Sequence, residues 1–260
     1  MKLDRRYVEK PWGRTELPPM FDTPSGERIG EVWYTSGEDL PLLAKYIFTS
    51  ERLSIQVHPN DEQARARGLA QGKSECWYIL DAEPGATLGL GLTREVSKDE
   101  LRAAALDGSI EMLMDWRGVK AGDFVFVPSG TVHAIGAGIS LLEFQQNADV
   151  TYRLYDYGRP RELHLDDGIA VSNATTFPEQ LIQHLSGNED NLLVDGPHFT
   201  LLQTNRNALQ DKRRWVMPLD SPVHAGAEVG GPGDVLLLQA GEGFESSGGR
   251  ILLGATAERT

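Results

Sequence analysis

Short segments in which apolar and polar residues alternate, or in which apolar residues run together, recur along most of this chain. Alternation with a period of two is typical of strands with one buried face, and short apolar runs are typical of strands buried on both faces. Glycines separate several of these segments as turn residues, which favours a β-barrel or sandwich over alternating strands and helices. Strands are predicted over residues 30–34, 43–48, 54–58, 72–80, 86–92, 123–127, 132–135, 140–146 and 150–155.

Helix signals are few and fall between the predicted strands. Ser97 and Glu100 form a capping-box pattern that predicts a helix to about Leu106, and a second short helix is expected over residues 109–115. Asp61 is the expected N-cap of a short polar helix. Residues 1–30 contain several prolines, and we expect them to form an irregular arm wrapped on the domain.

The strand pattern loosens between about residues 172 and 195 and then returns in segments such as 235–239 and 251–253. We therefore expect two domains, a larger one over residues 1–172 and a smaller β domain over residues 173–260. The chain of 260 residues is long enough for a sizeable core.

Composition and charge exclude several classes of protein. With 40% hydrophobic and 24% charged residues the chain is an ordinary globular protein, and its formal net charge of −13 argues against a nucleic-acid partner. A single cysteine excludes an internal disulfide and a thiolate zinc cluster. No signal peptide is visible, and no apolar stretch approaches the ~18 residues of a membrane span. We expect a cytoplasmic monomer or homodimer without a membrane partner.

The stretch Ser54–Asp61 carries the first candidate chemistry. On a strand, Gln56 and His58 share one face while their apolar neighbours point the other way. Glu75 and His133 lie in strand-like segments downstream. Two imidazoles, one carboxylate and one amide oxygen suit Zn²⁺, and the same set also fits Fe²⁺ or Mn²⁺. The alternative is that the first histidine is a surface residue at a strand end and the second a hydrogen-bonded core residue.

Lys73 lies two residues before Glu75 on the same predicted strand face. If Glu75 binds a metal, burial and the nearby cation would lower the pKa of Lys73, which would suit proton transfer or a phosphate contact. The alternative is a surface lysine whose head reaches solvent.

A second group of charges alternates on the strand near residue 150. Asp149 and Arg153 share a face, and Glu143 lies on the preceding predicted strand. Arg153 would neutralise a substrate anion, and either carboxylate would shuttle protons; the alternative is an internal salt bridge. Arg159 and Arg161 add positive charge at the strand's end, where a phosphate would dock unless both are solvated.

Several segments together resemble type I mannose-6-phosphate isomerase, above all its short bacterial form. The matching segments are 11–13, 30–33, 54–61, 72–77, 128–134 and 146–156. The resemblance covers roughly residues 8–170, and the remainder matches only in length and β character. It implies a mainly β, cupin (jelly-roll) barrel with a short helical insertion and a smaller C-terminal β domain. It also implies interconversion of mannose 6-phosphate and fructose 6-phosphate through a cis-enediol, with one zinc ion per chain.

The resemblance assigns roles to individual residues. In many longer members of the family a His precedes the active-site lysine, whereas this chain has Gly72 at that position. Many longer members also contain a large helical insert, in whose place this chain has only residues 94–117. The implied metal ligands are Gln56, His58, Glu75 and His133; the implied catalytic residues are Lys73, Arg153, Asp149 and Glu143, with Ser54 and Arg159 on the phosphate side of the substrate.

Three other functions are compatible with the same residues. Two histidines and a carboxylate also describe non-haem iron oxygenases, which metal analysis and anaerobic assays would distinguish. A non-catalytic metal- or sugar-binding cupin would not need both Lys73 and Arg153 beside the metal. A related isomerase could act on another sugar, phosphorylated or free.

Overall fold

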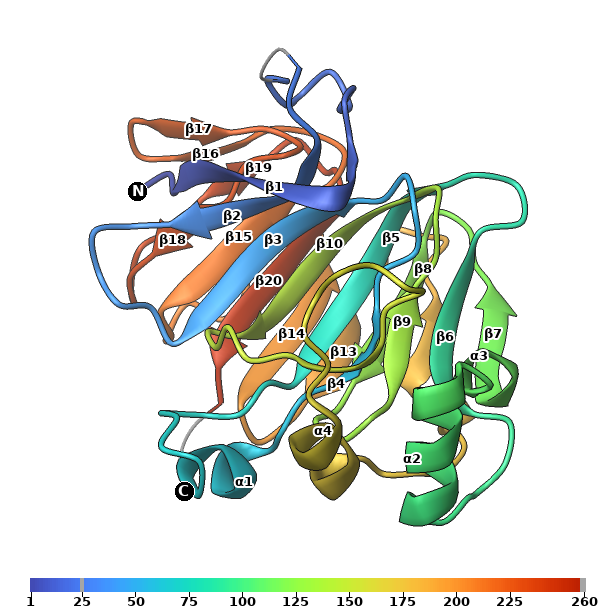
Figure 1. Cartoon of the computed structure of the whole chain (residues 1–260). Coiled ribbons are helices and arrows are strands. Elements are labelled where there is room, and N and C mark those ends of the chain that lie inside the picture. The colour runs from blue at the N-terminus through green and yellow to red at the C-terminus, as the bar shows by residue number, and fades with distance from the viewer. Residues whose placement is uncertain (24–25, 258–260) are drawn as a thin grey trace.

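The computed structural model describes residues 1–23 and 26–257, which form stacked antiparallel sheets with a few short helices (Figure 1). The expected mainly β architecture is therefore confirmed. The largest sheet has seven strands in the order β1-β2-β3-β10-β5-β8-β12. Their bounds are β1 Asp4–Arg14, β2 Ile29–Thr35, β3 Leu42–Phe48, β5 Glu75–Ala82, β8 Asp123–Val127, β10 Ile139–Gln146 and β12 Ile182–His184.

Strand β1 corrects the expectation of an irregular N-terminal arm. Residues Asp4–Arg14 form a regular edge strand that pairs antiparallel with β2, with register shifts after Val8 and Glu9. An edge strand tolerates Pro11 because it needs hydrogen-bond partners on one side only, and Pro11 lies between Glu9 and Arg14, where the register shifts. At the opposite edge β12 pairs with β8, so this sheet extends past residue 172.

A five-stranded sheet faces the first one, in the order β11-β4-β9-β6-β7. The alternation of side chains along β4 shows which face of this sheet is turned toward the first one. Ile55 and Val57 pack outward against the helices, so Gln56 between them faces the inner side. The strands are β4 Ile55–Val57, β6 Thr87–Leu92, β7 Met114–Gly118, β9 His133–Ile135 and β11 Tyr152–Tyr155.

The helices cover the outer face of the five-stranded sheet or cap the ends of strands. They are α1 Asp61–Arg65, α2 Lys98–Asp107, α3 Ile110–Leu113 and α4 Leu165–Val171, with a 3₁₀ turn over Glu179–Leu181. Ser97 caps α2 as expected by accepting a hydrogen bond from the Glu100 backbone N–H. The cap of α1 is Asn60 and not Asp61: Asn60 and Gln63 form a reciprocal capping box, which places Asp61 inside the first turn.

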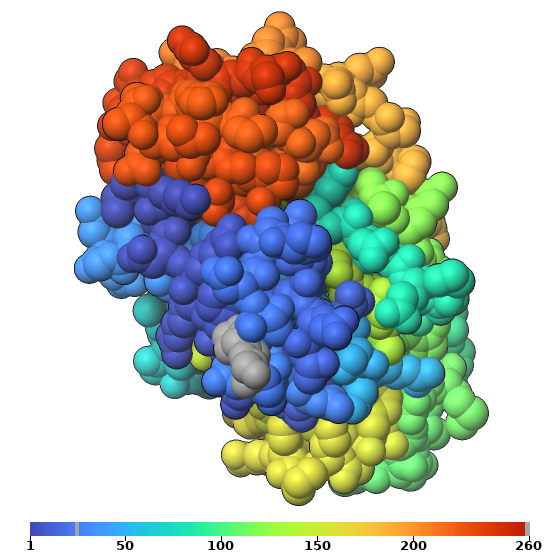
Figure 2. Space-filling view, turned by 90° about the horizontal axis from the view of Figure 1, so that it is seen from above, coloured from blue at the N-terminus to red at the C-terminus, as the bar shows by residue number. Residues whose placement is uncertain are grey.

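Two further sheets form the C-terminal part. A five-stranded sheet has the order β13-β14-β20-β15-β18, and a small sheet has the order β17-β16-β19. Figure 2 shows these residues gathered on one side of the molecule, with the N-terminal strands between them and residues near 160. The strands are β13 Asn191–Asp195, β14 Phe199–Thr204, β15 Arg214–Pro218, β16 Val223–Ala225, β17 Glu228–Gly230, β18 Leu236–Leu238, β19 Glu245–Ser246 and β20 Ile251–Thr256.

The outer face of the seven-stranded sheet is covered by the C-terminal five-stranded sheet. Phe144 of β10 makes edge-on ring contacts with Phe199 and Trp215 of the C-terminal sheet. Phe144 belongs to one continuous apolar cluster that includes residues of both sheets. Glu143 precedes Phe144 and therefore points to the opposite, inner side of the seven-stranded sheet. Among the described residues no helix combines the length and apolarity that crossing a membrane requires.

Candidate active site

The candidate metal donors lie on or next to strands of the two facing sheets. Gln56 of β4 is directly paired with His133 of β9, and Arg153 of β11 pairs with Gln56 from the other side. Glu75 begins β5 in the opposite sheet, and His58 follows β4. The sandwich therefore brings all four predicted donors to one place between its sheets.

Three of these donors form a compact buried group. Glu75 Oε2 lies 3.6 Å from His58 Nε2, and Glu75 Oε1 lies 3.3 Å from His133 Nε2. All candidate ligand atoms of this triad lie within 4.8 Å of one another. Gln56 Nε2 lies 3.2 Å from His133 Nε2, and Ser54 Oγ donates to Gln56 Oε1 at 3.1 Å. Gln56 thus extends the triad to four potential ligands.

The other ring nitrogens orient both imidazoles. His58 Nδ1 lies 2.7 Å from the Val150 carbonyl oxygen, and His133 Nδ1 lies 2.9 Å from the Thr131 carbonyl oxygen. Each carbonyl can only accept, so Nδ1 carries the proton and Nε2 presents its lone pair to Glu75. Such outer hydrogen bonds are a regular property of metal-binding histidines.

Two of the buried donor atoms lack hydrogen-bond partners of their own. His58 Nε2 and Glu75 Oε1 are inaccessible to solvent and make no hydrogen bond to any residue that the structure describes, whereas Glu75 Oε2 has the Lys73 ammonium group at 2.8 Å. Leaving such polar atoms unpaired is costly. A divalent cation between the imidazoles and the carboxylate would satisfy both atoms, and the nitrogen and oxygen donors fit zinc.

The electrostatics keep the donors in the forms that bind metal. Burial, with help from Lys73, lowers the pKa of His58 to about 3, and burial also lowers the pKa of His133. Burial alone would raise the pKa of Glu75, but Lys73 and the histidines hold it well below its usual range. Near neutral pH the site therefore offers two neutral imidazoles and one carboxylate.

Lys73 lies directly beside this group. Its Nζ is 2.8 Å from Glu75 Oε2 and 3.8 Å from Glu143 Oε1. The lowered pKa of Lys73 predicted from the sequence depends on a metal bound to Glu75 and stays a prediction. Burial would lower this pKa, yet the charges of Glu143 and Glu75 outweigh burial and raise it. The two carboxylates therefore favour the ammonium form of Lys73 in the protein alone.

Lys45 is a site residue that sequence reasoning did not assign. It is buried, and its Nζ donates to Glu143 Oε1 at 3.1 Å, while Trp77 Nε1 donates to Glu143 Oε2 at 3.0 Å. Lys45, Glu143 and Trp77 occupy one cross-strand row over β3, β10 and β5. A lysine in the otherwise apolar segment Leu42–Phe48 was the available signal, because a fully buried lysine needs a carboxylate partner.

A cavity of about 410 Å³, here called the charged cavity, opens above the candidate metal group. Most of its wall is polar or charged, and it includes several predicted site residues. Glu31 and Lys10, which form an ion pair at 3.4 Å, are lining residues that the sequence did not single out. The lining is Lys10, Trp12, Glu31, Lys45, Ile47, Leu53, Ser54, Gln56, Lys73, Ile135, Glu143, Asp149, Thr151, Arg153, Arg161 and His164.

The two arginines after β11 are placed differently from each other. Arg161 lines the charged cavity, whereas Arg159 is not among its lining residues. Arg159 forms an ion pair with Asp156 at 2.8 Å, and its guanidinium lies 5.5 Å from the Tyr157 ring centroid. Asp156 also holds Arg161, through Nε and Nη2 at 2.6 Å each. Burial and the charge of Arg161 lower the pKa of Arg153. The two guanidinium groups are therefore close enough to contribute positive charge to the same region of the cavity.

Gly72, where many longer relatives carry histidine, lies where the chain passes very close to another segment. A Cβ at this position would collide with the backbone of Pro59 and Asn60. The Lys73 backbone N–H donates to the Pro59 carbonyl oxygen at 3.0 Å. The absence of a side chain at Gly72 lets Lys73 and His58 lie on adjacent backbone segments.

Several known proteins are similar to this chain in sequence and in fold. A family model described as phosphomannose isomerase type I, catalytic domain, matches residues 19–93. The mannose-6-phosphate isomerase ManA of Bacillus subtilis is 36% identical over 243 residues, which covers 76% of this chain and 77% of that protein. A crystal structure of the Bacillus subtilis mannose 6-phosphate isomerase matches with a TM-score of 0.79 and 29% identity, over 97% of this chain and 98% of that one.

A zinc-bound mannose 6-phosphate isomerase structure has the same fold, with a TM-score of 0.73 at 14% identity over 99% of each chain. The expected cupin-type fold is confirmed by these structural matches, although its two facing sheets are hydrogen-bonded separately and do not form a closed barrel. Because the sequence match to ManA extends over more than two thirds of both proteins, this chain belongs to the type I mannose-6-phosphate isomerase family.

Proposed function

We propose that this protein interconverts mannose 6-phosphate and fructose 6-phosphate. The observation that carries the proposal is the placement of Lys73 in the lining of the charged cavity, 2.8 Å from Glu75 of the candidate metal group and 3.8 Å from Glu143. Membership of the mannose-6-phosphate isomerase family supports the choice of substrate. A cavity with a proton-transfer group and fixed positive charge suits an aldose–ketose isomerisation through an anionic intermediate.

We further propose zinc as the cofactor, one ion per chain, held by Gln56, His58, Glu75 and His133. Support comes from the buried His58 Nε2 and Glu75 Oε1, which have no hydrogen-bond partner among the described residues, and from the neutral state of both imidazoles. The zinc-bound relative of the same fold supports the same choice. When bound, zinc supplies Lewis acidity that favours negative charge on the sugar oxygens.

The arginines of the charged cavity provide for the anionic substrate. Arg153 and Arg161 line the same wall, and Ser54 lies on the lining next to Gln56. In a protein with a net charge of −13, a phosphate ester needs such a local cluster of cations. We assign the phosphate group to Arg161 and place Arg153 over the oxygens that become negative during the reaction. Arg159, the phosphate-side residue suggested by family resemblance, is directed to Asp156 and Tyr157.

The isomerisation moves one proton from C2 to C1 and a second from the C2 hydroxyl to the oxygen on C1. Lys73 is positioned to pass the second proton, because its ammonium group lies 2.8 Å from Glu75 and lines the charged cavity. A cation bound at Glu75 would lower the pKa of Lys73 toward the range that proton transfer needs. Glu143 in turn is fixed by Lys45 and Trp77, so it positions Lys73. Asp149 lines the cavity wall and is the candidate for assisting ring opening.

A coupled assay tests the proposal. Zinc-loaded protein should convert mannose 6-phosphate to fructose 6-phosphate, chelation should abolish turnover, and added zinc should restore it. Free mannose is the matched substrate without phosphate, and it should react far more slowly. Absence of turnover with either sugar in zinc-replete protein would defeat the proposal, and equal turnover of both would assign the protein to another substrate class.

A further inference from the structure

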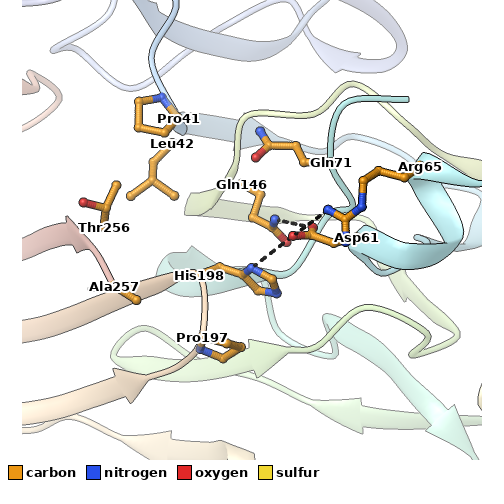
Figure 3. A pocket seen from close by; sticks show the side chains of 10 residues that line it. All are labelled: Pro41, Leu42, Asp61, Arg65, Gln71, Gln146, Pro197, His198, Thr256 and Ala257. Atoms are coloured by element: carbon orange, nitrogen blue, oxygen red, sulfur yellow. Dashed lines mark hydrogen bonds and ion pairs between the residues drawn. The ribbon is translucent and has the colours of Figure 1, made fainter. Parts of the chain in front are cut away.

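A second cavity of about 630 Å³ is lined by side chains that include Asp61 and Gln71, which lie close in sequence to His58 and Glu75 (Figure 3). It shares no lining residue with the charged cavity. It forms where the N-terminal part of the chain meets the C-terminal sheet. Its lining residues are Pro41, Leu42, Asp61, Arg65, Gln71, Gln146, Pro197, His198, Thr256 and Ala257.

The polar groups of this second cavity converge on the carboxylate of Asp61. Asp61 Oδ1 accepts hydrogen bonds from the Gly72 backbone N–H and from Gln146 Nε2, both at 2.9 Å. Asp61 Oδ2 lies 3.7 Å from Arg65 Nη1 and 3.9 Å from His198 Nδ1. These two distances are too long for hydrogen bonds. Figure 3 shows the side chains of Asp61, Arg65, Gln146 and His198 directed toward one another.

The arrangement leaves bonding capacity for a small ligand. Arg65 and His198 can donate to an oxyanion, and Asp61 Oδ2 can accept from a hydroxyl group. Pro41, Leu42 and other apolar residues of the lining can pack against the face of a sugar ring. The volume falls in the range of roughly 300–1,000 Å³ that is usual for small-molecule sites. We propose that this second cavity binds a hydroxylated oxyanion of about the size of a sugar phosphate.

The ligand would also affect the candidate active site, because Asp61 is connected to it by hydrogen bonds. Gln146, which donates to Asp61, accepts a hydrogen bond through Oε1 from the Ser74 backbone N–H at 2.9 Å. Ser74 lies between Lys73 and Glu75. A ligand that draws Asp61 toward the cavity would therefore shift the segment that positions both residues. We expect occupancy to change kcat more than KM.

Calorimetry on the full-length, zinc-loaded protein tests the site without relying on activity. Glucose 1-phosphate is a suitable probe, because its phosphate blocks C1 and it cannot be isomerised. Saturable binding is expected, and R65A/H198A should weaken it at least about tenfold, since charge-assisted hydrogen bonds are lost. Arg102→Ala is the matched control: this exposed arginine pairs with Asp166 and lines neither cavity.

Turnover of mannose 6-phosphate then tests the connection between the two cavities. The probe should change kcat in the unmodified protein and in Arg102→Ala, but not in R65A/H198A. Absence of binding at millimolar probe, binding that R65A/H198A leaves intact, or purely competitive inhibition would each overturn the proposed site. Binding that is lost in the double variant but never alters kcat would retain the site and refute its connection to Lys73 and Glu75. Calorimetry needs no turnover, so it tests the second cavity even if the protein does not isomerise mannose 6-phosphate. Failure of the proposed function would appear only in the turnover assay.

Discussion

Arg161→Ala removes the guanidinium group that we assign to the substrate phosphate. In the structure Arg161 uses Nε and Nη2 to hold Asp156, and neither bond involves Nη1. The residue lines the charged cavity and its charge acts on Arg153. The perturbation therefore deletes one charge-assisted contact to the phosphate and leaves the candidate metal group untouched.

The size of the effect follows from that single contact. A hydrogen bond to a charged group contributes about 1.5–3 kcal/mol, which corresponds to a roughly 10- to 150-fold loss in kcat/KM. The phosphate does not react, so its contact is equally strong in the ground state and the transition state. The loss should therefore appear as a higher KM with kcat nearly unchanged. The buried Asp156 carboxylate keeps its ion pair with Arg159 at 2.8 Å, so no buried charge is left unpaired.

Steady-state kinetics on mannose 6-phosphate should compare Arg161→Ala with Arg159→Ala. Both variants remove one arginine from Asp156, but only Arg161 lines the charged cavity. Arg159→Ala should change KM by less than about threefold, because Arg159 does not line the charged cavity and Arg161 still pairs with Asp156. An increase in KM for Arg159→Ala equal to that of Arg161→Ala would refute the assignment. A fall in kcat alone for Arg161→Ala would refute it as well.

Four further predictions concern the metal group, the proton donor and the packing. Glu75→Gln removes the one anionic member of the proposed ligand set, so bound zinc measured by elemental analysis should fall well below one ion per chain while circular dichroism stays unchanged; full occupancy would contradict the assignment. Lys73→Met should lower kcat by about 10²-fold or more with zinc content retained, because general acid catalysis contributes at least that much; unchanged turnover would exclude Lys73 from proton transfer. In metal-free protein His58 has a pKa of about 3 against its ordinary 6.5, so between these values the unfolded chain binds more protons than the folded one. Its contribution to stability is therefore complete above pH 6.5 and is lost as pH falls, by up to ~1.4 kcal/mol per pH unit, and urea denaturation that gives equal stability at pH 7 and pH 5 would speak against it. Gly254→Ala places a methyl group against the Phe144 ring and should lower the free energy of unfolding by about 1–3 kcal/mol, whereas Gly118→Ala, which has open space around it, is the control for calorimetry.

Local periodicity predicted much of the geometry of the candidate site. Because side chains alternate along a strand, Ile55 and Val57 had to face away from Gln56, and the structure packs them against the helices. The same argument placed Lys73 near Glu75 on one face. These relations involve neighbours in sequence, so they need no knowledge of how the strands pair.

The features that the sequence did not predict depend on distant pairing or on loops. Lys45 meets Glu143 only because β3 and β10 pair in one particular register across 98 positions of sequence. Arg161 reaches the charged cavity, and Arg159 does not, because the chain turns sharply at Tyr157 and Gly158, which have φ values of 55° and 78°. Strand alternation ends at such a turn and gives no information beyond it.

The prediction of an irregular arm at residues 1–30 was wrong for a related reason. Pro11 disfavours a strand in the middle of a sheet, but not at an edge, and only the assembled sheet shows that β1 is an edge strand. The identity of the substrate also lies outside periodicity. Family membership and not strand geometry supports mannose 6-phosphate.

The alternation of Glu143 and Phe144 on β10 has a consequence for synthesis of the chain. Phe144 belongs to an apolar face that is covered by β14, β15 and β20, which the ribosome makes later than every strand that surrounds the candidate metal group. While the nascent chain is still growing, the catalytic half therefore exposes a broad apolar surface of the kind that promotes aggregation. A fragment ending before β13 should consequently depend on chaperones or self-associate, even though it contains all the proposed metal ligands and catalytic residues.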